Sequence, residues 1–208
     1  SFSFYANKNM TTGEGGMLTT SDEKLAQRFE ILRLHGMSRD AWKRYAGGSF
    51  RYDILESGFK YNMSDIQAAL GIVQLRRLEG FIARRNAIAQ RYRERLADAK
   101  SIRLQAEAPT GDRHAYHLLA VQLERGEGAP ERQRVIEHLV AAKIPFSVHF
   151  IPLESMTHFR ATYATSDKSL PVTTTLGEEL ISLPMYPDLS DAQVDRVAEV
   201  FLDALAAG

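Results

Sequence analysis

The stretch 7–16 is the part of the chain best suited to covalent chemistry, because a lysine is followed there by two threonines and a glycine-rich turn. A lysine amine forms a Schiff base with a carbonyl only when it is deprotonated, a state that desolvation or a nearby cation promotes. The small residues after Lys8 would let a planar cofactor approach the backbone. Covalent catalysis by Lys8 is one hypothesis, and a surface lysine in a glycine-rich hairpin is the other. The order Gly-Lys-Ser/Thr is absent, which excludes a Walker-type phosphate loop.

Other residue types that carry chemistry are sparse. The chain has no cysteine, which excludes disulfides, thiolate metal ligands and a cysteine nucleophile. His114 and His117 share a short spacing, but no third ligand is evident and no metal site is expected. A run of arginines on a helical segment is predicted to be a solvent-exposed face: Arg76, Arg77, Arg84 and Arg85.

The composition of the chain limits the kinds of partner that we expect. The 208 residues are 44% hydrophobic and 25% charged, and 26 basic residues balance 26 acidic ones. A net charge of zero gives no electrostatic attraction to nucleic acid or to an anionic membrane, so neither partner is expected. No apolar run is long enough to cross a bilayer, and the first residues lack the pattern of a signal peptide. A cytoplasmic location is expected.

The elements that would position the lysine are short. Strands are predicted at 1–5 and 17–20, on either side of the glycine turn. Thr20 and Glu23 form a capping-box pattern, which predicts that a helix begins at that point. The segment 38–58 has no steady periodicity and is predicted to be a long surface loop.

A second capping-box pattern, Ser64 with Gln67, opens a longer helical segment. The apolar periodicity weakens at Gly80 and then resumes as far as Leu96. The pattern therefore predicts either one long bent helix or two helices in succession. We place the domain boundary in this segment, after residue 85.

The remainder alternates strand and helix patterns. Strands are predicted at 116–123 and 146–151, and a third capping box, Ser190 with Gln193, predicts the last helix. Alternation of strands and helices indicates an α/β or α+β protein.

Six strings of the chain resemble, in order and spacing, segments of the DegT/DnrJ/EryC1/StrS family of pyridoxal-phosphate-dependent sugar aminotransferases. They are residues 3–16, 34–41, 58–69, 114–118, 147–153 and 183–187. The resemblance implies an α/β fold in which 1–85 form the C-terminal part of a fold-type I large domain that binds pyridoxal phosphate. Residues 86–208 would then form the small C-terminal α/β domain.

The resemblance also implies site residues. Lys8 matches the lysine that binds pyridoxal phosphate and moves a proton between cofactor and substrate carbons, first as base and then as acid. Ser3 matches a serine that contacts the cofactor phosphate. His149 matches a histidine on the substrate side, with a purely structural histidine as the alternative. Tyr5 replaces a residue that is often histidine and is a further substrate-side candidate.

One matching segment concerns a second subunit. Residues 59–62 match a stretch that, in the family, reaches across a homodimer interface to the cofactor phosphate of the partner subunit. Many members have Asn-Tyr-Arg where this chain has Lys60, Tyr61 and Asn62. Lys60 would act as a point charge and Asn62 as a hydrogen-bond donor, and the choice between them stays open. Phe59 and Tyr61 could alternatively be interface core.

The implied activity is transfer of an amino group, from glutamate, to a nucleotide-linked keto sugar. Members that dehydrate or deoxygenate sugars typically have histidine in place of the lysine, so Lys8 argues against that branch. In the family the acid against the pyridine nitrogen and the phosphate-binding turn precede the lysine. The chain is therefore expected to correspond to the second half of a subunit and to be inactive alone. The alternative is a catalytically incomplete fragment or a non-enzymatic dimerising or binding module.

Overall fold

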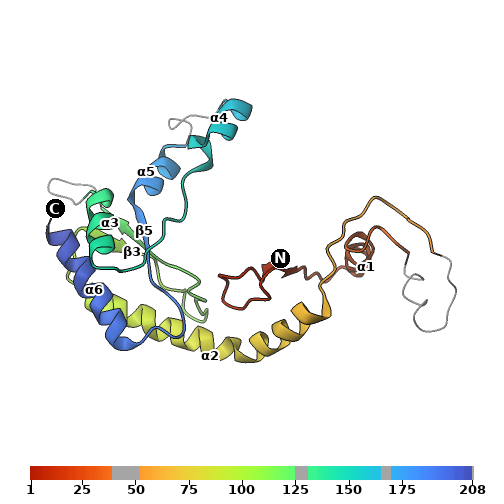
Figure 1. Cartoon of the computed structure of the whole chain (residues 1–208), viewed down its shortest axis with the longest axis horizontal. Coiled ribbons are helices and arrows are strands. Elements are labelled where there is room, and N and C mark those ends of the chain that lie inside the picture. Colours follow the sequence, from red (N-terminus) through yellow and green to blue (C-terminus); the bar gives the residue numbers. More distant parts are fainter. Residues whose placement is uncertain (39–51, 125–130, 165–169, 208) are drawn as a thin grey trace. The chain divides into compact units, whose positions relative to one another are not determined.

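The computed structural model describes residues 1–38, 52–124, 131–164 and 170–207, and most of the predicted loop at 38–58 lies outside them. The chain divides into two compact units, Ser1–Glu79 and Gly80–Gly208 (Figure 1). The division falls inside a helix, as does the boundary predicted after residue 85. Assignment of the units to a large and a small domain stays a prediction.

The first unit begins with a small antiparallel hairpin. Strand β1 (Phe2–Ser3) pairs with β2 (Gly16–Met17), in the register Phe2 to Met17 and Ser3 to Gly16. Both strands are shorter than the patterns at 1–5 and 17–20 predicted. The hairpin encloses the lysine and the glycine turn between its two strands.

Helix α1 (Glu23–Leu32) is capped differently from the prediction. Asp22, and not Thr20, is the N-cap residue, and its Oδ1 accepts hydrogen bonds from the backbone amides of Lys24 and Leu25. Thr20 instead accepts a bond from the amide of Asp22. A carboxylate at the N-cap satisfies two free amides and opposes the positive end of the helix dipole, which explains the difference.

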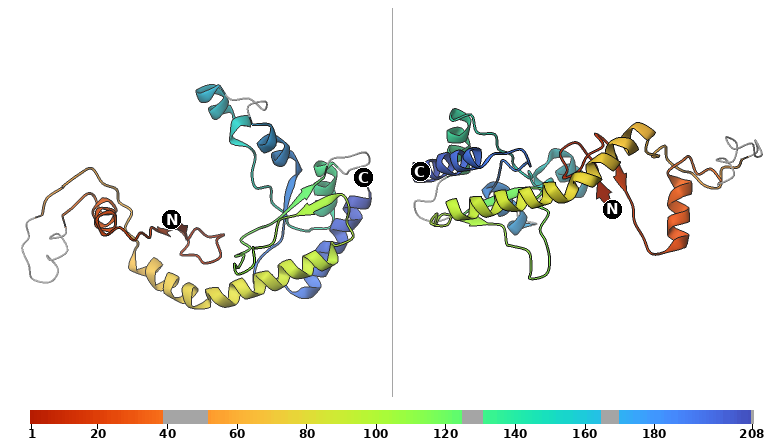
Figure 2. Two further views of the ribbon diagram at one scale, coloured as in Figure 1. Left: turned by 180° about the vertical axis from the view of Figure 1, so that it is seen from behind. Right: turned by 90° about the horizontal axis from the view of Figure 1, so that it is seen from below.

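The helical segment after Ser64 is one helix, α2 (Asp65–Arg95), 31 residues long, and it is continuous in both views of Figure 2. Its capping box is confirmed, because Gln67 Oε1 accepts from the amide of Ser64 and Ser64 Oγ accepts from the amide of Gln67. Gly80 does not interrupt it, so the alternative of two successive helices is wrong. In the described part of the chain, no helix is both long and apolar enough to cross a lipid bilayer.

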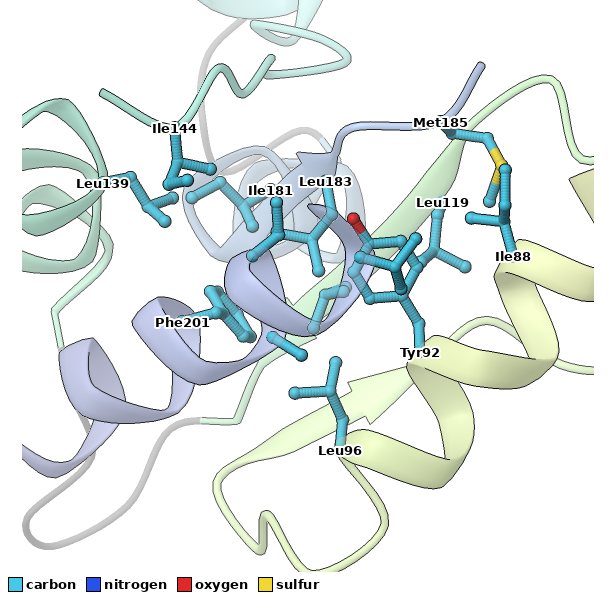
Figure 3. Packing of buried hydrophobic residues seen from close by; sticks show 14 of the residues in the cluster. Ile88, Tyr92, Leu96, Leu119, Leu139, Ile144, Ile181, Leu183, Met185 and Phe201 are labelled. Atoms are coloured by element: carbon cyan, nitrogen blue, oxygen red, sulfur yellow. The ribbon is translucent and has the colours of Figure 1, made fainter. Parts of the chain in front are cut away.

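The second unit is built on a three-stranded antiparallel sheet in the order β3 (Ile102–Leu104), β4 (Leu119–Leu123), β5 (Leu180–Leu183). Helices α3 (Arg132–Ala141) and α6 (Asp191–Ala206) pack against each other, and the Ser190–Gln193 capping box of α6 is confirmed. Figure 3 shows side chains of α2, α6 and the sheet meeting in one apolar core. Its largest fully buried members are Tyr92, Phe201, Ile88, Leu119, Leu139 and Ile181.

The segment 146–151 is not a strand, which corrects the prediction. A single isolated bridge joins Ser147 to Ser182 of β5, and the chain then leaves the sheet. Three short helices, which the sequence patterns did not predict, follow along the chain: η2 (Leu153–Ser155), α4 (Thr157–Tyr163) and α5 (Pro171–Glu179).

The arginine run is not uniformly solvent-exposed, which corrects a second prediction. Arg85 is 5% exposed, and its Nη1 donates to the carbonyl oxygens of Tyr116 at 2.9 Å, Met185 at 2.9 Å and His117 at 3.3 Å. Burial lowers the pKa of the Arg85 guanidinium. Three carbonyls from two loops share this donor, so Arg85 fixes both loops to α2 because buried carbonyls require partners.

Candidate active site

Lys8 lies in a loop that its own backbone closes. The carbonyl of Phe4 accepts from the amide of Thr12 at 2.9 Å and from the hydroxyl of Thr11 at 3.1 Å. The amide of Lys8 donates to the carbonyl of Tyr5 at 3.0 Å, which makes a turn within the loop. We call residues 5–11 the lysine loop. Its two ends meet on Phe4, which is buried, so the half-buried Lys8 side chain projects from a fixed base.

The buried hydroxyl of Thr12 continues this arrangement towards β2. Thr12 Oγ1 donates to the carbonyl of Glu14 at 2.6 Å, and the amide of Phe4 donates to the carbonyl of Gly15 at 2.9 Å. Gly15 has φ of +143°, and a Cβ there would lie 2.6 Å from Thr12 Oγ1. Only glycine fits this position, because a side chain would meet both strained backbone and the Thr12 hydroxyl.

Helix α2 supports the loop through one face. Gln67 Nε2 donates to the carbonyl of Glu14 at 2.9 Å, and Gln74 Oε1 accepts from the amide of Thr11 at 3.4 Å. Between them, a Cβ at Gly71 would lie 3.1 Å from Thr12 Cγ2. Residues 67, 71 and 74 recur at intervals of four and three and therefore share a helix face. Gly71 lets the backbone of α2 come close to Thr12.

Ser3 and Tyr5 stand at the start of the lysine loop. Ser3 ends β1, and its Oγ accepts a hydrogen bond from the amide of Tyr5 at 3.3 Å. Both side chains are exposed, and Tyr5 retains 47% of its accessible surface. The hairpin thus brings Ser3, Tyr5 and Lys8 into one short segment with a hydroxyl, a phenol and an amine.

Lys60 and Asn62 are brought together as neighbours. Lys60 Nζ donates to Asn62 Oδ1, so the cation and the amide lie side by side. The backbone of the segment is held against the end of α1, because the amides of Phe59 and Tyr61 donate to the carbonyls of residues 32 and 33. The rings of Phe59 and Tyr61 stack with centroids 4.8 Å apart and are 52% and 74% exposed. The segment thus presents an ammonium group and a side-chain amide next to two exposed aromatic rings.

His149 belongs to the second unit. Its Nδ1 lies 2.9 Å from Oγ of Ser182 on β5, and its ring meets that of Phe150 edge to face at 4.7 Å. The imidazole is half-buried. Its contact with Ser182 was not predicted, because a sequence pattern cannot pair positions so far apart. The relation of Gln67 and Gly71 to the lysine loop was missed for the same reason.

The donor set of the first unit suits a phosphate-bearing aldehyde. An amine on a closed loop can bind an aldehyde carbon, and a hydroxyl, an ammonium and an amide are ordinary donors to phosphate oxygens. Ser3, Lys8, Lys60 and Asn62 supply these groups. In the described residues no cluster of three or more histidine, aspartate or glutamate side chains could hold a metal ion.

Comparison with known proteins gives consistent matches. The family described as DegT/DnrJ/EryC1/StrS aminotransferase matches residues 1–202. The uncharacterised protein MJ1066 of Methanocaldococcus jannaschii is 44% identical over 195 residues, which are 93% of this chain and 50% of that protein. The spore coat polysaccharide biosynthesis protein SpsC of Bacillus subtilis is 41% identical over 204 residues, covering 97% of this chain and 52% of SpsC.

A solved structure extends the likeness to the fold. Spr1654 of Streptococcus pneumoniae, assigned as a sugar aminotransferase and solved in its PMP form, superposes with a TM-score of 0.87 at 32% identity. The match covers 99% of this chain and 52% of that one, so the chain spans about half the length of the proteins it matches. The superposition confirms the predicted α/β fold of a fold-type I aminotransferase.

The contact between Gly71 and Thr12 predicts different effects of the same substitution at two glycines of α2. Gly80→Ala meets nothing within 4 Å and should raise the free energy of unfolding by about 1 kcal/mol through helix propensity. Gly71→Ala should raise the free energy of unfolding by less than this, or lower it, because the new methyl group would displace Thr12 Cγ2. Urea unfolding measures both values.

Thr12→Ser removes that methyl group and keeps the hydroxyl bonded to Glu14. In the Thr12→Ser background, Gly71→Ala should raise the free energy of unfolding nearly as much as Gly80→Ala does. The coupling free energy between positions 12 and 71 should be at least about 0.5 kcal/mol. Equal effects at Gly71 and Gly80, or no coupling with Thr12, would contradict the proposed support of the loop.

Proposed function

This chain belongs to the DegT/DnrJ/EryC1/StrS family of pyridoxal-phosphate-dependent sugar aminotransferases, and on that basis we propose that it supplies the lysine half of an aminotransferase active site. The reaction would move the amino group of glutamate to a keto sugar linked to a nucleotide. The observation that carries the proposal is the closed loop that presents Lys8, at whose start the Ser3 hydroxyl accepts from the amide of Tyr5. The name of SpsC supports a product destined for a polysaccharide. We also propose a cytoplasmic location, where nucleoside triphosphates provide activated sugars.

The roles follow from the chemistry of each side chain. When bound, pyridoxal phosphate supplies an electron sink that eases removal of a proton from the amino-bearing carbon. Lys8 would hold the cofactor through Nζ, and as a free amine this nitrogen would accept that proton and return it as an acid. The Ser3 hydroxyl would donate to the phosphate. His149 would contact the sugar substrate, with Tyr5 as a further contact.

A homodimer is part of the proposal. Lys60 and Asn62 would serve the phosphate of the partner subunit, the lysine by charge and the amide by its N–H groups. Support comes from the stacked, exposed rings of Phe59 and Tyr61 and from Ile66, which is 84% exposed at the start of α2. Neighbouring exposed apolar side chains of this kind mark protein interfaces.

Replacement of Lys8 tests the catalytic role. In the full-length protein, Lys8→Ala should lower the rate at which glutamate is converted to 2-oxoglutarate about a thousandfold, because both the binding amine and the proton carrier are lost. Lys24→Ala removes the same charge from an exposed position on α1 and should change the rate less than about twofold. Turnover by Lys8→Ala at the wild-type rate would refute the proposal.

Subunit mixing tests the shared site. Co-expression of Lys8→Ala subunits with Lys60→Ala/Asn62→Ala subunits gives heterodimers in which one site carries both lesions and the other carries none. Random mixing should then restore about a quarter of the wild-type activity, since half of the dimers carry one intact site of two. Sites built within single subunits would show no recovery, and that result would exclude the action in trans.

A further inference from the structure

Ser182 holds the segment that carries His149 with both its backbone and its side chain. Its amide donates to the carbonyl of Ser147 at 2.8 Å, and its carbonyl accepts from the amide of Ser147 at 3.1 Å. Its hydroxyl oxygen lies 2.9 Å from His149 Nδ1. One residue of β5 thus fixes both the path of residues 147–149 and the orientation of the imidazole.

The position of Ser182 in the sheet makes this hydroxyl unusual. Alternation along β5 sends Ile181 and Leu183 into the apolar core, and Ser182 points to the opposite face together with its cross-strand partner Ala120. Ser182 is nevertheless only 4% exposed. A hydroxyl this well buried requires a hydrogen-bond partner, and within the described chain the partner it reaches is Nδ1 of His149.

The direction of that bond decides the tautomer of the ring. A serine hydroxyl carries one proton that needs an acceptor, and a neutral imidazole has one nitrogen that accepts and one that donates. Donation from the Ser182 hydroxyl to Nδ1 would satisfy the serine proton within the contact that the structure shows. The proton of the ring is then placed on Nε2.

We infer that Ser182 is a positioning residue that holds His149 as the Nε2–H tautomer, so that the histidine donates a hydrogen bond to an oxygen of the nucleotide-linked sugar. The inference rests on the proposed function, which gives His149 its place on the substrate side. A fixed tautomer and a fixed ring make His149 a preorganised donor, which costs less to order when the sugar binds.

Nitrogen NMR of the full-length protein with ¹⁵N-labelled histidine tests the tautomer directly, with the His149 signals assigned by their loss in His149→Gln. Wild type should show an unprotonated Nδ1 and a protonated Nε2. Ser182→Ala should shift the ring towards a mixture of tautomers, whereas Ser147→Ala keeps the backbone bonds to Ser182 and should leave the signals in place. A protonated Nδ1 in wild type would overturn the inference.

Kinetics separate this inference from the proposed function. Ser182→Ala should raise KM for the keto sugar, but by less than His149→Gln does, because only part of the imidazole population then presents a correctly oriented donor, with kcat changed less than about twofold. The half-reaction with glutamate should be unchanged, and Ser147→Ala should match wild type. If His149→Gln raises KM for the sugar and Ser182→Ala does not, the positioning role fails alone. If His149→Gln leaves KM unchanged, the substrate-side role of His149 fails first.

Discussion

The methyl group of buried Thr12 lies against helix α2 at Gly71, where the backbone carries no side chain, and this contact sets how closely the lysine loop approaches the helix. The Thr12 amide closes the loop on the carbonyl of Phe4, so a shift of Thr12 would move the base from which Lys8 projects. Gln67 adds a direct hydrogen bond from the same face. The placement of the amine therefore depends on packing against a regular helix, which is a more precise support than a free loop.

Local signals in the sequence sufficed for the starts of α2 and α6, and they failed at α1, where Asp22 caps the helix, and wherever distant residues decide. The capping boxes at Ser64 and Ser190 were predicted because all their partners lie within three residues. Arg85 was expected on a solvated face, yet two loops distant in sequence bring three carbonyls to it. The predicted strand at 146–151 failed because β5 offers it a single bridge, at Ser147, and tertiary pairing decides strand formation.

The residues of the candidate site also differ in whether the local sequence could reveal them. Lys8 stood out by its residue type and its glycine-rich surroundings, and resemblance to the family added roles for Ser3 and His149. Gly71 and Ser182 carried no signal, because a helical glycine and a serine in a short strand are common residues. Their contacts become visible only when the chain folds and brings Thr12 to α2 and His149 to β5. Residues that support a site are therefore harder to predict than residues that perform its chemistry.

The covalent attachment point of the cofactor is the most direct test of the central claim, that Lys8 is the amine presented for catalysis. The full-length protein is incubated with pyridoxal phosphate, reduced with borohydride, digested, and analysed by peptide mass spectrometry. The closed loop predicts a pyridoxyl label on Lys8, at one label per subunit. A label on Lys24 or Lys60 with Lys8 unmodified, or a protein that takes up no label, would contradict the assignment.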